Sequence, residues 1–313
     1  MKEIKNVVVV GGGMMGNALA MVFASSPDLH VTLKTRKLRD DRWDAIINNY
    51  DIMIARGAAT EQEKKEVMDR IHFEEDEAKA YTDADFIIEC APEVMETKQN
   101  LFAGIENYCS DDCILATNTS VMSPTEISAK CKHRERVVGA HFWNPGHLIP
   151  LVEVVKSNYT TEEVMDATMA LLTKVGKKPI YCKKDVPGFV ANRLQHALWR
   201  EAFYMVENGI ADAKTVDDAC KFGPGLRWPV MGPMENSDVV GIQLSKNIHD
   251  YILPHLADNH EPSKCLQEML DRGDLGFKTG KGWQEWTKEQ MDASNTGLRE
   301  YLIDYIAKQK KNG

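Results

Sequence analysis

The chain has 313 residues, of which 43% are hydrophobic and 27% are charged, so it is large enough for about two folded domains and is not expected to be disordered. Its net charge of −9 argues against nucleic acid or an anionic membrane as its main partner. No apolar run approaches the roughly 20 residues of a membrane-spanning helix, and the run Val7–Val10, followed by glycines, is unlike a secretory signal.

Strands and helices alternate in the first part of the chain. Val7–Val10 is a short β-branched run that ends in glycine, which is typical of a strand buried on both faces of a parallel sheet. The other predicted strands span 29–34, 86–89, 114–116, 137–140, 151–155 and 179–181, and the predicted helices span 16–25, 40–56, 61–70, 96–108 and 162–175. This alternation predicts an α/β fold, a doubly wound Rossmann sheet, over residues 1–184.

The pattern changes after the segment Asp185-Val186-Pro187-Gly188. From there on only helical spacing is found, and helices are predicted at 190–208, 213–221, 239–255 and 263–272. We therefore expect a second, all-helical domain over residues 185–313.

The seven cysteines are scattered along the chain, their number is odd, and no CxxC pair occurs. This usage predicts reduced, mostly buried thiols and a cytoplasmic protein. Cys109 and Cys113 are spaced to lie one helical turn apart, but no nearby Cys or His pair completes a ligand set. We therefore expect no metal site.

The segment Gly11–Gly16, GGGMMG, satisfies the GxGxxG pattern of dinucleotide-binding loops. It follows a predicted buried strand and begins a helix, which is the context that gives the pattern its meaning. A first glycine permits the tight turn, a second lets the backbone approach the pyrophosphate, and a third lets helix and strand pack closely. The expected cofactor-binding residues here are Gly11, Gly13, Met14, Met15 and Gly16. The alternative is a glycine turn without a ligand.

The end of the second strand departs from the usual pattern. NAD-binding units place an acidic residue there to bind the ribose hydroxyls, whereas this chain has Thr35 followed by Arg36 and Lys37. Loss of the carboxylate removes repulsion against a 2′-phosphate, and the two cations can bind it. We predict that Thr35, Arg36 and Lys37 bind NAD(P), with NADP favoured over NAD. The alternative is a solvated basic turn balanced by Asp40 and Asp41.

Two residues of neighbouring predicted strands form a candidate acid–base pair. His141 follows one apolar strand and Glu153 lies within the next, LVEVV, where an ionised carboxylate is unfavourable unless it is paired. Such a pair suits hydride transfer, because oxidation of an alcohol requires removal of its hydroxyl proton, which an imidazole oriented by a carboxylate can accept. The alternative is a hydrogen-bonded core histidine with Glu153 facing solvent.

Six separated motifs occur in order along the chain: GGGMMG (11–16), ADFIIECAPEVMETKQNLF (84–102), ATNTSVMSPTEI (116–127), HFWNP (141–145), LVEVV (151–155) and DVPGFVANRL (185–194). Together they resemble the L-3-hydroxyacyl-CoA dehydrogenase family over essentially the whole chain. The resemblance implies an N-terminal Rossmann domain, a helical domain that forms a homodimer, an active site in the cleft between the two domains, and a place in fatty acid metabolism.

The resemblance also implies roles for the substrate-side residues. His141 would be the general acid/base, and Glu153 its orienting carboxylate. Ser120 would hydrogen-bond the reacting oxygen of the substrate, and Asn192 would do so from the second domain, which suits donors that face a developing oxyanion. Taken without the resemblance, Ser120 is typical of a loop or capping serine and Asn192 of a helix-surface amide.

On the cofactor side, the resemblance implies that Asn144 helps to place the nicotinamide and that Glu93 and Lys98 line the cofactor. We also expect Asn118 to contact the cofactor. All four residues lie in the matched motifs, either just after a predicted strand or at the start of the following helix.

One stretch of the predicted helical domain departs from the acyl-CoA members of the family. Residues 223–233 read GPGLRWPVMGP, and the LRWPV insertion resembles members that act on free acids, such as carnitine dehydrogenase and the gulonate dehydrogenase/lambda-crystallin group. The fork-shaped guanidinium of Arg227 suits recognition of a carboxylate of the substrate or of a partner subunit. The alternative is a structural ion pair at a dimer interface.

These observations predict an oxidoreductase that transfers a hydride between a nicotinamide cofactor and a short L-3-hydroxyacyl substrate. A first alternative is a dehydrogenase of a free 3-hydroxy acid. A second, of another class, is a non-catalytic NAD(P)-binding structural or regulatory protein. Retention of Ser120, His141, Glu153 and Asn192 together favours an enzyme.

Overall fold

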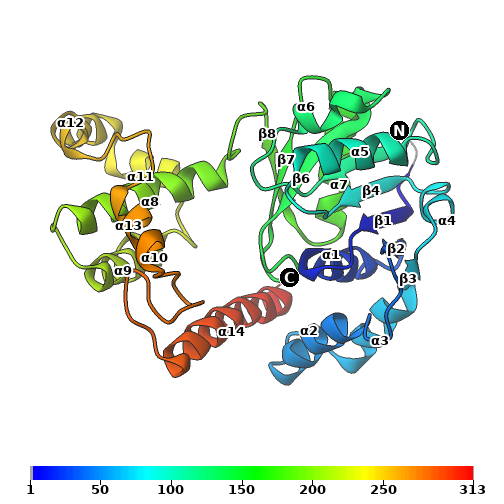
Figure 1. Ribbon diagram of the computed structural model, residues 1–313, viewed down its shortest axis with the longest axis horizontal. Helices are drawn as coiled ribbons and strands as arrows, with labels where there is room; N and C mark the ends of the chain where they lie inside the picture. Colours follow the sequence, from blue (N-terminus) through cyan, green and yellow to red (C-terminus); the bar gives the residue numbers. More distant parts are fainter. Residues whose placement is uncertain (1–2, 313) are drawn as a thin grey trace. The chain divides into compact units, whose positions relative to one another are not determined.

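The computed structural model describes residues 3–312, and its contacts divide the chain into two compact units (Figure 1). The first unit comprises residues up to Arg193 and from Leu298 onward, and the second comprises Leu194–Gly297. The division expected after residue 184 therefore differs from the observed one, and the chain returns to the first unit at its end. Burial explains both differences, because Phe189 is 2% exposed and Ile303 is 1% exposed within hydrophobic clusters of the first unit.

An eight-stranded sheet forms the centre of the first unit, in the order β3-β2-β1-β4-β5-β6-β7-β8. The strands are β1 (Asn6–Val10), β2 (His30–Lys34), β3 (Ile71–Glu74), β4 (Phe86–Glu89), β5 (Ile114–Thr117), β6 (Val137–Phe142), β7 (Leu151–Val155) and β8 (Lys178–Cys182). Strands β1 to β6 are parallel, β7 is antiparallel to β6, and β8 is parallel to β7. The strand order reverses between β1 and β4, the position at which doubly wound sheets bind their ligands.

Helices cover both faces of this sheet (Figure 1). The helices of the first unit are α1 (Met14–Ala24), α2 (Asp44–Ala55), α3 (Glu61–Arg70), α4 (Glu77–Tyr81), α5 (Met95–Ile105), α6 (Pro124–Ile127), α7 (Glu162–Lys174), the start of α8 (Ala191–Glu207) and the end of α14 (Lys288–Asn312). Successive valines of β1 point to opposite faces, so Val9 packs in the cluster that contains Phe23 of α1, and Val8 in the cluster that contains Phe102 of α5. The predicted Rossmann sheet is confirmed.

Several elements were not predicted from the sequence, among them the short helices α4 and α6, strand β3 and helix α14. Strand β3 has only four residues and follows α3 directly, without a Gly, Pro or Asn to mark a boundary between them. Helix α14 carries mostly polar side chains and contains Gly297, so its amphipathic pattern is weak. Strand β3 and helix α14 gain their stability from burial, of Ile71 and Phe73 in β3 and of Ile303 in α14.

The second unit is helical, as predicted. It contains the remainder of α8, α9 (Ala213–Phe222), α10 (Pro224–Arg227), α11 (Pro233–Val240), α12 (Ile242–Ile252), the 3-10 turn Leu253–His255, α13 (Lys264–Arg272) and the first part of α14. The single helix expected at 239–255 is interrupted at Gly241, whose φ of 95° lies in the region that favours glycine. Large apolar side chains remain exposed on this unit, including Val230, Met234 and Tyr251 at 84%, 78% and 80%.

Within the described residues, no helix has the length and apolar character that a membrane crossing requires. The seven cysteines are all unpaired, and four of them are buried, in agreement with the expected reduced, mostly buried thiols.

Candidate active site

His141 and Glu153 occupy directly opposite positions on the antiparallel strands β6 and β7. Opposed residues of such a pair have their Cβ atoms only about 5 Å apart, so the two side chains meet on one face of the sheet. His141 Nδ1 lies 2.9 Å from Glu153 Oε2, and both side chains are buried. The expected pair is therefore formed, and the alternative in which Glu153 faces solvent is wrong.

The buried carboxylate of Glu153 is fully hydrogen-bonded. Its Oε2 also accepts from Trp143 Nε1 at 3.1 Å, and its Oε1 accepts from the backbone amides of Val190 and Ala191 at 2.9 and 2.8 Å. Burial by itself raises the pKa of Glu153, but the hydrogen bonds from His141, the two amides and the indole hold it below its ordinary value. Glu153 is thus an ionised acceptor that fixes the ring of His141.

The same carboxylate fixes the start of α8, which carries Asn192. The Asn192 side chain is 9% exposed and donates from Nδ2 to the backbone carbonyl of Ser120 at 3.0 Å. Ser120 is partly exposed and follows the carboxyl end of β5. Two groups of hydrogen bonds within the first unit, one around Glu153 with His141 and the other between Asn192 and Ser120, are therefore linked through the backbone at the start of α8. The sequence predicts Asn192 in the second domain, whereas its contacts place it in the first unit.

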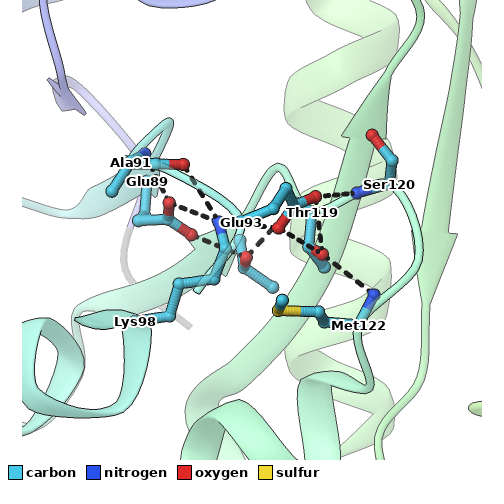
Figure 2. A network of polar contacts seen from close by, with 8 residues as sticks. Glu89, Ala91, Glu93, Lys98, Thr119, Ser120 and Met122 are labelled. Atoms are coloured by element: carbon cyan, nitrogen blue, oxygen red, sulfur yellow. Dashed lines mark hydrogen bonds and ion pairs between the residues drawn. The ribbon is translucent and has the colours of Figure 1, made fainter. Parts of the chain in front are cut away.

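Glu93 and Lys98 lie in a polar network beside Ser120 (Figure 2). Glu93 accepts a hydrogen bond from the Ser120 amide at 2.6 Å. Lys98 is only 1% exposed, and its Nζ lies 2.7 Å from Glu89 Oε1 and 3.3 Å from Glu93 Oε2. The ammonium therefore lies beneath the surface at which a contact with the cofactor was expected, and Glu89 is a buried partner that the sequence interpretation missed.

The two asparagines expected near the cofactor have different environments. Asn118 is partly buried, and its Oδ1 accepts from the backbone amide of Phe142 at 2.8 Å, which ties the end of β5 to β6. Asn144 is exposed in the loop that follows β6, three residues after His141. Asn118 is thus partly used for internal structure, whereas Asn144 is accessible in the loop that follows β6.

The glycine loop fits a dinucleotide pyrophosphate. The fold itself requires Gly11 and Gly16: Gly11 has a φ of 117°, and a Cβ on Gly16 would lie 1.6 Å from the carbonyl oxygen of Gly11. A Cβ on Gly13 would meet nothing within 4 Å, so the protein's own packing does not explain this glycine. Gly13 is the N-cap of α1 and offers no side-chain cap, so the helix end presents free backbone amides to an anion.

The two methionines of the loop differ in exposure. Met14 is 71% exposed at the first position of α1, beside the open space in front of Gly13. Met15 is partly buried and packs against the main hydrophobic cluster. Met14 is therefore accessible to a ligand of the loop, while Met15 contributes mainly to the core.

The basic turn after β2 lies next to the glycine loop. A Cβ on Gly12 would lie 2.8 Å from Thr35 Cγ2, so Thr35 packs against the loop. Arg36 and Lys37 are exposed, and neither forms an ion pair with any residue among 3–312. Asp41, which was considered as a balancing charge, pairs with Arg39 instead, at 2.6 Å.

Arg227 ends the short helix α10 in the second unit. Its side chain is exposed, and its guanidinium makes no ion pair within the part of the chain that the structure describes. The backbone carbonyl of Arg227 accepts from the amides of Val230 and Met231 at 2.9 and 2.8 Å, so the LRWPV insertion forms a compact turn.

A cavity of about 540 Å³ in the first unit contains none of the acid–base residues. It is lined in part by His147 and by Lys177, whose Nζ donates to the carbonyls of Gly146 and Ile149 at 2.6 and 2.9 Å. Burial lowers the pKa of Lys177 to about 8, and burial with nearby positive charge lowers the pKa of His147 to about 4. Among residues 3–312, no group of His, Cys, Asp or Glu side chains is arranged to hold a metal ion.

Two contributors to the site were missed from the sequence. Trp143 lies two positions beyond His141 in a strand-like segment, so the period of two already placed both on one face. Glu89 ends a wholly buried strand, FIIE, where an ionised side chain requires a partner, and the same argument that selected Glu153 would have selected it.

Comparisons with known proteins agree with this arrangement. The protein-family model of the 3-hydroxyacyl-CoA dehydrogenase NAD binding domain matches residues 6–186. The family model of the 3-hydroxyacyl-CoA dehydrogenase C-terminal domain matches residues 188–286. The L-carnitine dehydrogenase of Bacillus cereus is 35% identical over 247 residues, which cover 76% of this chain and 72% of that protein. A probable 3-hydroxybutyryl-CoA dehydrogenase of Bacillus subtilis is 32% identical over 292 residues, which cover 92% of this chain and 99% of that protein.

A solved structure is similar over nearly the whole chain. The crystal structure of 5-formyl-3-hydroxy-2-methylpyridine 4-carboxylic acid 5-dehydrogenase, described as an NAD+ dependent dismutase, superposes with a TM-score of 0.87 at 29% identity. The match covers 96% of this chain and 97% of that one.

Proposed function

The chain belongs to the 3-hydroxyacyl-CoA dehydrogenase family, and from this membership we propose that it interconverts a short L-3-hydroxy compound and its 3-keto form with His141 as general acid/base. The observation that carries the proposal is the contact of His141 Nδ1 with the buried, fully hydrogen-bonded carboxylate of Glu153. A carboxylate held at Nδ1 leaves Nε2 as the ring atom that exchanges a proton.

In the oxidative direction, His141 Nε2 takes the hydroxyl proton of the substrate, and Glu153 stabilises the positive ring that results. Ser120 and Asn192, which their mutual hydrogen bond holds together, bind the reacting oxygen as it becomes a carbonyl. The glycine loop and Asn144 would hold the nicotinamide cofactor, which would accept the hydride in oxidation and supply it in reduction. In reduction His141 returns the proton to the same oxygen.

We propose that the glycine loop and the basic turn hold the cofactor. The free amides at the start of α1 suit the pyrophosphate, and the open space at Gly13 allows its close approach. Asn144, which is exposed in the loop that follows β6, suits contact with the nicotinamide. Thr35, with the unpaired Arg36 and Lys37, supports a preference for NADP over NAD, since these cations are available to a 2′-phosphate.

Two substrate classes fit the proposed chemistry. The B. subtilis relative is named for 3-hydroxybutyryl-CoA, a thioester, and the B. cereus relative for L-carnitine, a free acid. The unpaired guanidinium of Arg227 favours the free acid, because it is available to a substrate carboxylate. A short 3-hydroxyacyl-CoA remains the leading class because most of the sequence motifs match it.

The proposal is tested by following nicotinamide absorbance. The enzyme is assayed with NAD(H) and NADP(H) against acetoacetyl-CoA and a panel of free 3-hydroxy and 3-keto acids. Turnover that His141→Ala abolishes supports the proposal, and turnover unchanged by this substitution removes His141 from the mechanism. Tight cofactor binding without turnover of any substrate would favour a non-catalytic structural protein.

We also propose that the chain forms a homodimer through its helical unit in the cytoplasm. The exposed apolar side chains of this unit, such as Val230, Met234 and Tyr251, are suited to a buried interface between two copies. Seven unpaired cysteines suit a reducing compartment. Sedimentation velocity tests the oligomeric state.

A further inference from the structure

We propose that the buried ion pair of Glu89 and Lys98 is a positioning device for Ser120, and that it acts through Glu93. The contacts of Glu89, Lys98 and Glu93 with one another and with Ser120 are observed in the structure, whatever the activity. Only their effect on catalysis rests on the proposed function, in which Ser120 binds the reacting oxygen. Glu89 and Lys98 are thus positioning residues, which act without touching substrate or cofactor.

The sheet places Glu89 at the centre of the ligand-binding edge. Glu89 is the last residue of β4 and pairs with Val10 of β1 on one side and with Thr117 of β5 on the other. The glycine loop follows Val10, and the loop that contains Ser120 follows Thr117. The carboxylate therefore lies where the loops of the cofactor and of the substrate oxygen leave the sheet.

The pair is buried but completely satisfied. Glu89 and Lys98 are 0% and 1% exposed, with 2.7 Å between Nζ and Oε1. Glu89 Oε2 accepts from Thr117 Oγ1 at 2.7 Å, Oε1 accepts from the Ala91 amide at 2.5 Å, and Lys98 Nζ also donates to the Ala91 carbonyl at 3.3 Å. Apolar residues of similar volume often stabilise a core as well as a buried ion pair does, so the pair calls for a role other than stability.

A second contact of Lys98, with Glu93, links the buried ion pair to Ser120 (Figure 2). Lys98 Nζ lies 3.3 Å from Glu93 Oε2 and holds this half-exposed carboxylate in place. Glu93 in turn accepts from Thr119 Oγ1 at 3.0 Å and from the Ser120 amide at 2.6 Å. Thr119 Oγ1 accepts from the Met122 amide at 3.0 Å, which closes the turn.

Ser120 is thereby fixed on both sides of its backbone. Its amide is held by Glu93, and its carbonyl accepts from Asn192 at 3.0 Å. A hydroxyl that binds a reacting oxygen must be placed to a fraction of an ångström, because a displacement of about 1 Å can cost about 100-fold in rate. Removal of Lys98 is expected to let the Glu93 side chain move, and the Ser120 amide then loses its fixed acceptor.

The central test uses the double variant Glu89→Gln/Lys98→Met. Both charges are removed together, so neither is left buried and unpaired, and the introduced glutamine keeps an acceptor for Thr117. We expect kcat to fall about 10- to 100-fold while KM for the cofactor stays unchanged. Glu93→Gln, which leaves the buried pair intact, should lower kcat in the same way. Glu96→Gln, on the exposed side of α5, is the matched control and should leave kcat unchanged.

A Ser120→Ala background separates positioning from a direct role. If Lys98 acts through Ser120, the double variant causes no further loss of kcat in this background. The proposal would be overturned if the double variant lowers kcat by the same factor in the Ser120→Ala background as in the wild type. It would also be overturned if the double variant leaves kcat unchanged, with or without a raised KM for the cofactor.

Hydrogen exchange of the Ser120 amide does not depend on catalysis, so it tests this inference separately from the proposed function. We expect the Ser120 amide hydrogen to exchange faster in Glu93→Gln and in the double variant than in Glu96→Gln, as measured by NMR. Faster exchange in a protein that turns over no 3-hydroxy substrate would support the positioning contact and reject the proposed function. Unchanged exchange would overturn the inference whatever the activity.

Discussion

The carboxylate of Glu153 accepts a hydrogen bond from the backbone amide of Ala191, the first residue of α8, at 2.8 Å. The same side chain holds the ring of His141 at 2.9 Å. One buried acid therefore orients the proposed base and also anchors the helix start that carries Asn192. A change at Glu153 is expected to disturb proton transfer and the binding of the substrate oxygen together.

Replacement of Glu153 by glutamine should show how much of its role depends on the negative charge, because the shape of the side chain is kept. Glu153→Gln keeps an oxygen for the α8 amides but removes the negative charge that stabilises a protonated ring. We expect kcat to fall by at least about 100-fold, with a smaller effect on KM for the cofactor. Steady-state kinetics checks this, with Glu163→Gln on the exposed side of α7 as the control. A loss shared equally by the control would argue against the assigned role.

Cofactor choice should depend on the turn after β2. Arg36→Ala/Lys37→Ala removes two cations that have no ionic partner among the described residues. We expect kcat/KM for NADPH to fall about 10-fold or more, the value of one or two charge-assisted hydrogen bonds, with NADH affected little. Arg39→Ala, which breaks only the pair with Asp41, should change neither value. Equal losses with both cofactors would contradict a 2′-phosphate site.

The acid stability of the first unit should depend on His147. Its pKa is lowered from 6.5 to about 4, first by burial and then by Lys177 and Arg299. Between these values the unfolded chain binds more protons than the folded one, so the stability is fully present above pH 6.5 and falls as the pH drops toward 4. The loss amounts to about 3 kcal/mol.

His147→Gln should remove that part of the pH dependence, because glutamine does not titrate. Urea unfolding at about pH 7 and about pH 4.5 measures the free energy of unfolding for the wild type, for His147→Gln and for His30→Gln, an exposed control on β2. An identical pH dependence of the wild type and His147→Gln would show that His147 titrates normally in the folded protein.

Substrate choice should respond to Arg227. If its guanidinium binds a substrate carboxylate, Arg227→Ala raises KM for free 3-hydroxy acids about 10-fold or more and leaves KM for acyl-CoA thioesters unchanged. Lys221→Ala, at an exposed position of α9, is the control. An Arg227→Ala enzyme with unchanged KM for every acidic substrate would leave Arg227 without a role in recognition.

Much of the fold and part of the site follow from local sequence. The buried run Val7–Val10, the glycine loop and the strand–helix alternation predicted the Rossmann sheet, because periodicity and glycine positions report which faces are buried and where the chain turns. Glu153 among valines predicted a partner for its charge, and His141 was correctly selected. These are properties that a short stretch of chain expresses by itself.

Tertiary structure alone decided which distant groups share a contact. That Glu89 accepts from Thr117, and that Glu93 accepts from the Ser120 amide, follows from the pairing of β4 with β5 and not from spacing along the chain. That Asn192 and the end of α14 belong with the first unit follows from burial of Phe189 and Ile303, which local patterns do not report. The sequence by itself determined the sheet and the acid–base pair, while the partners of each buried charge were decided by long-range packing, because desolvation must be compensated by whichever groups the fold brings within reach.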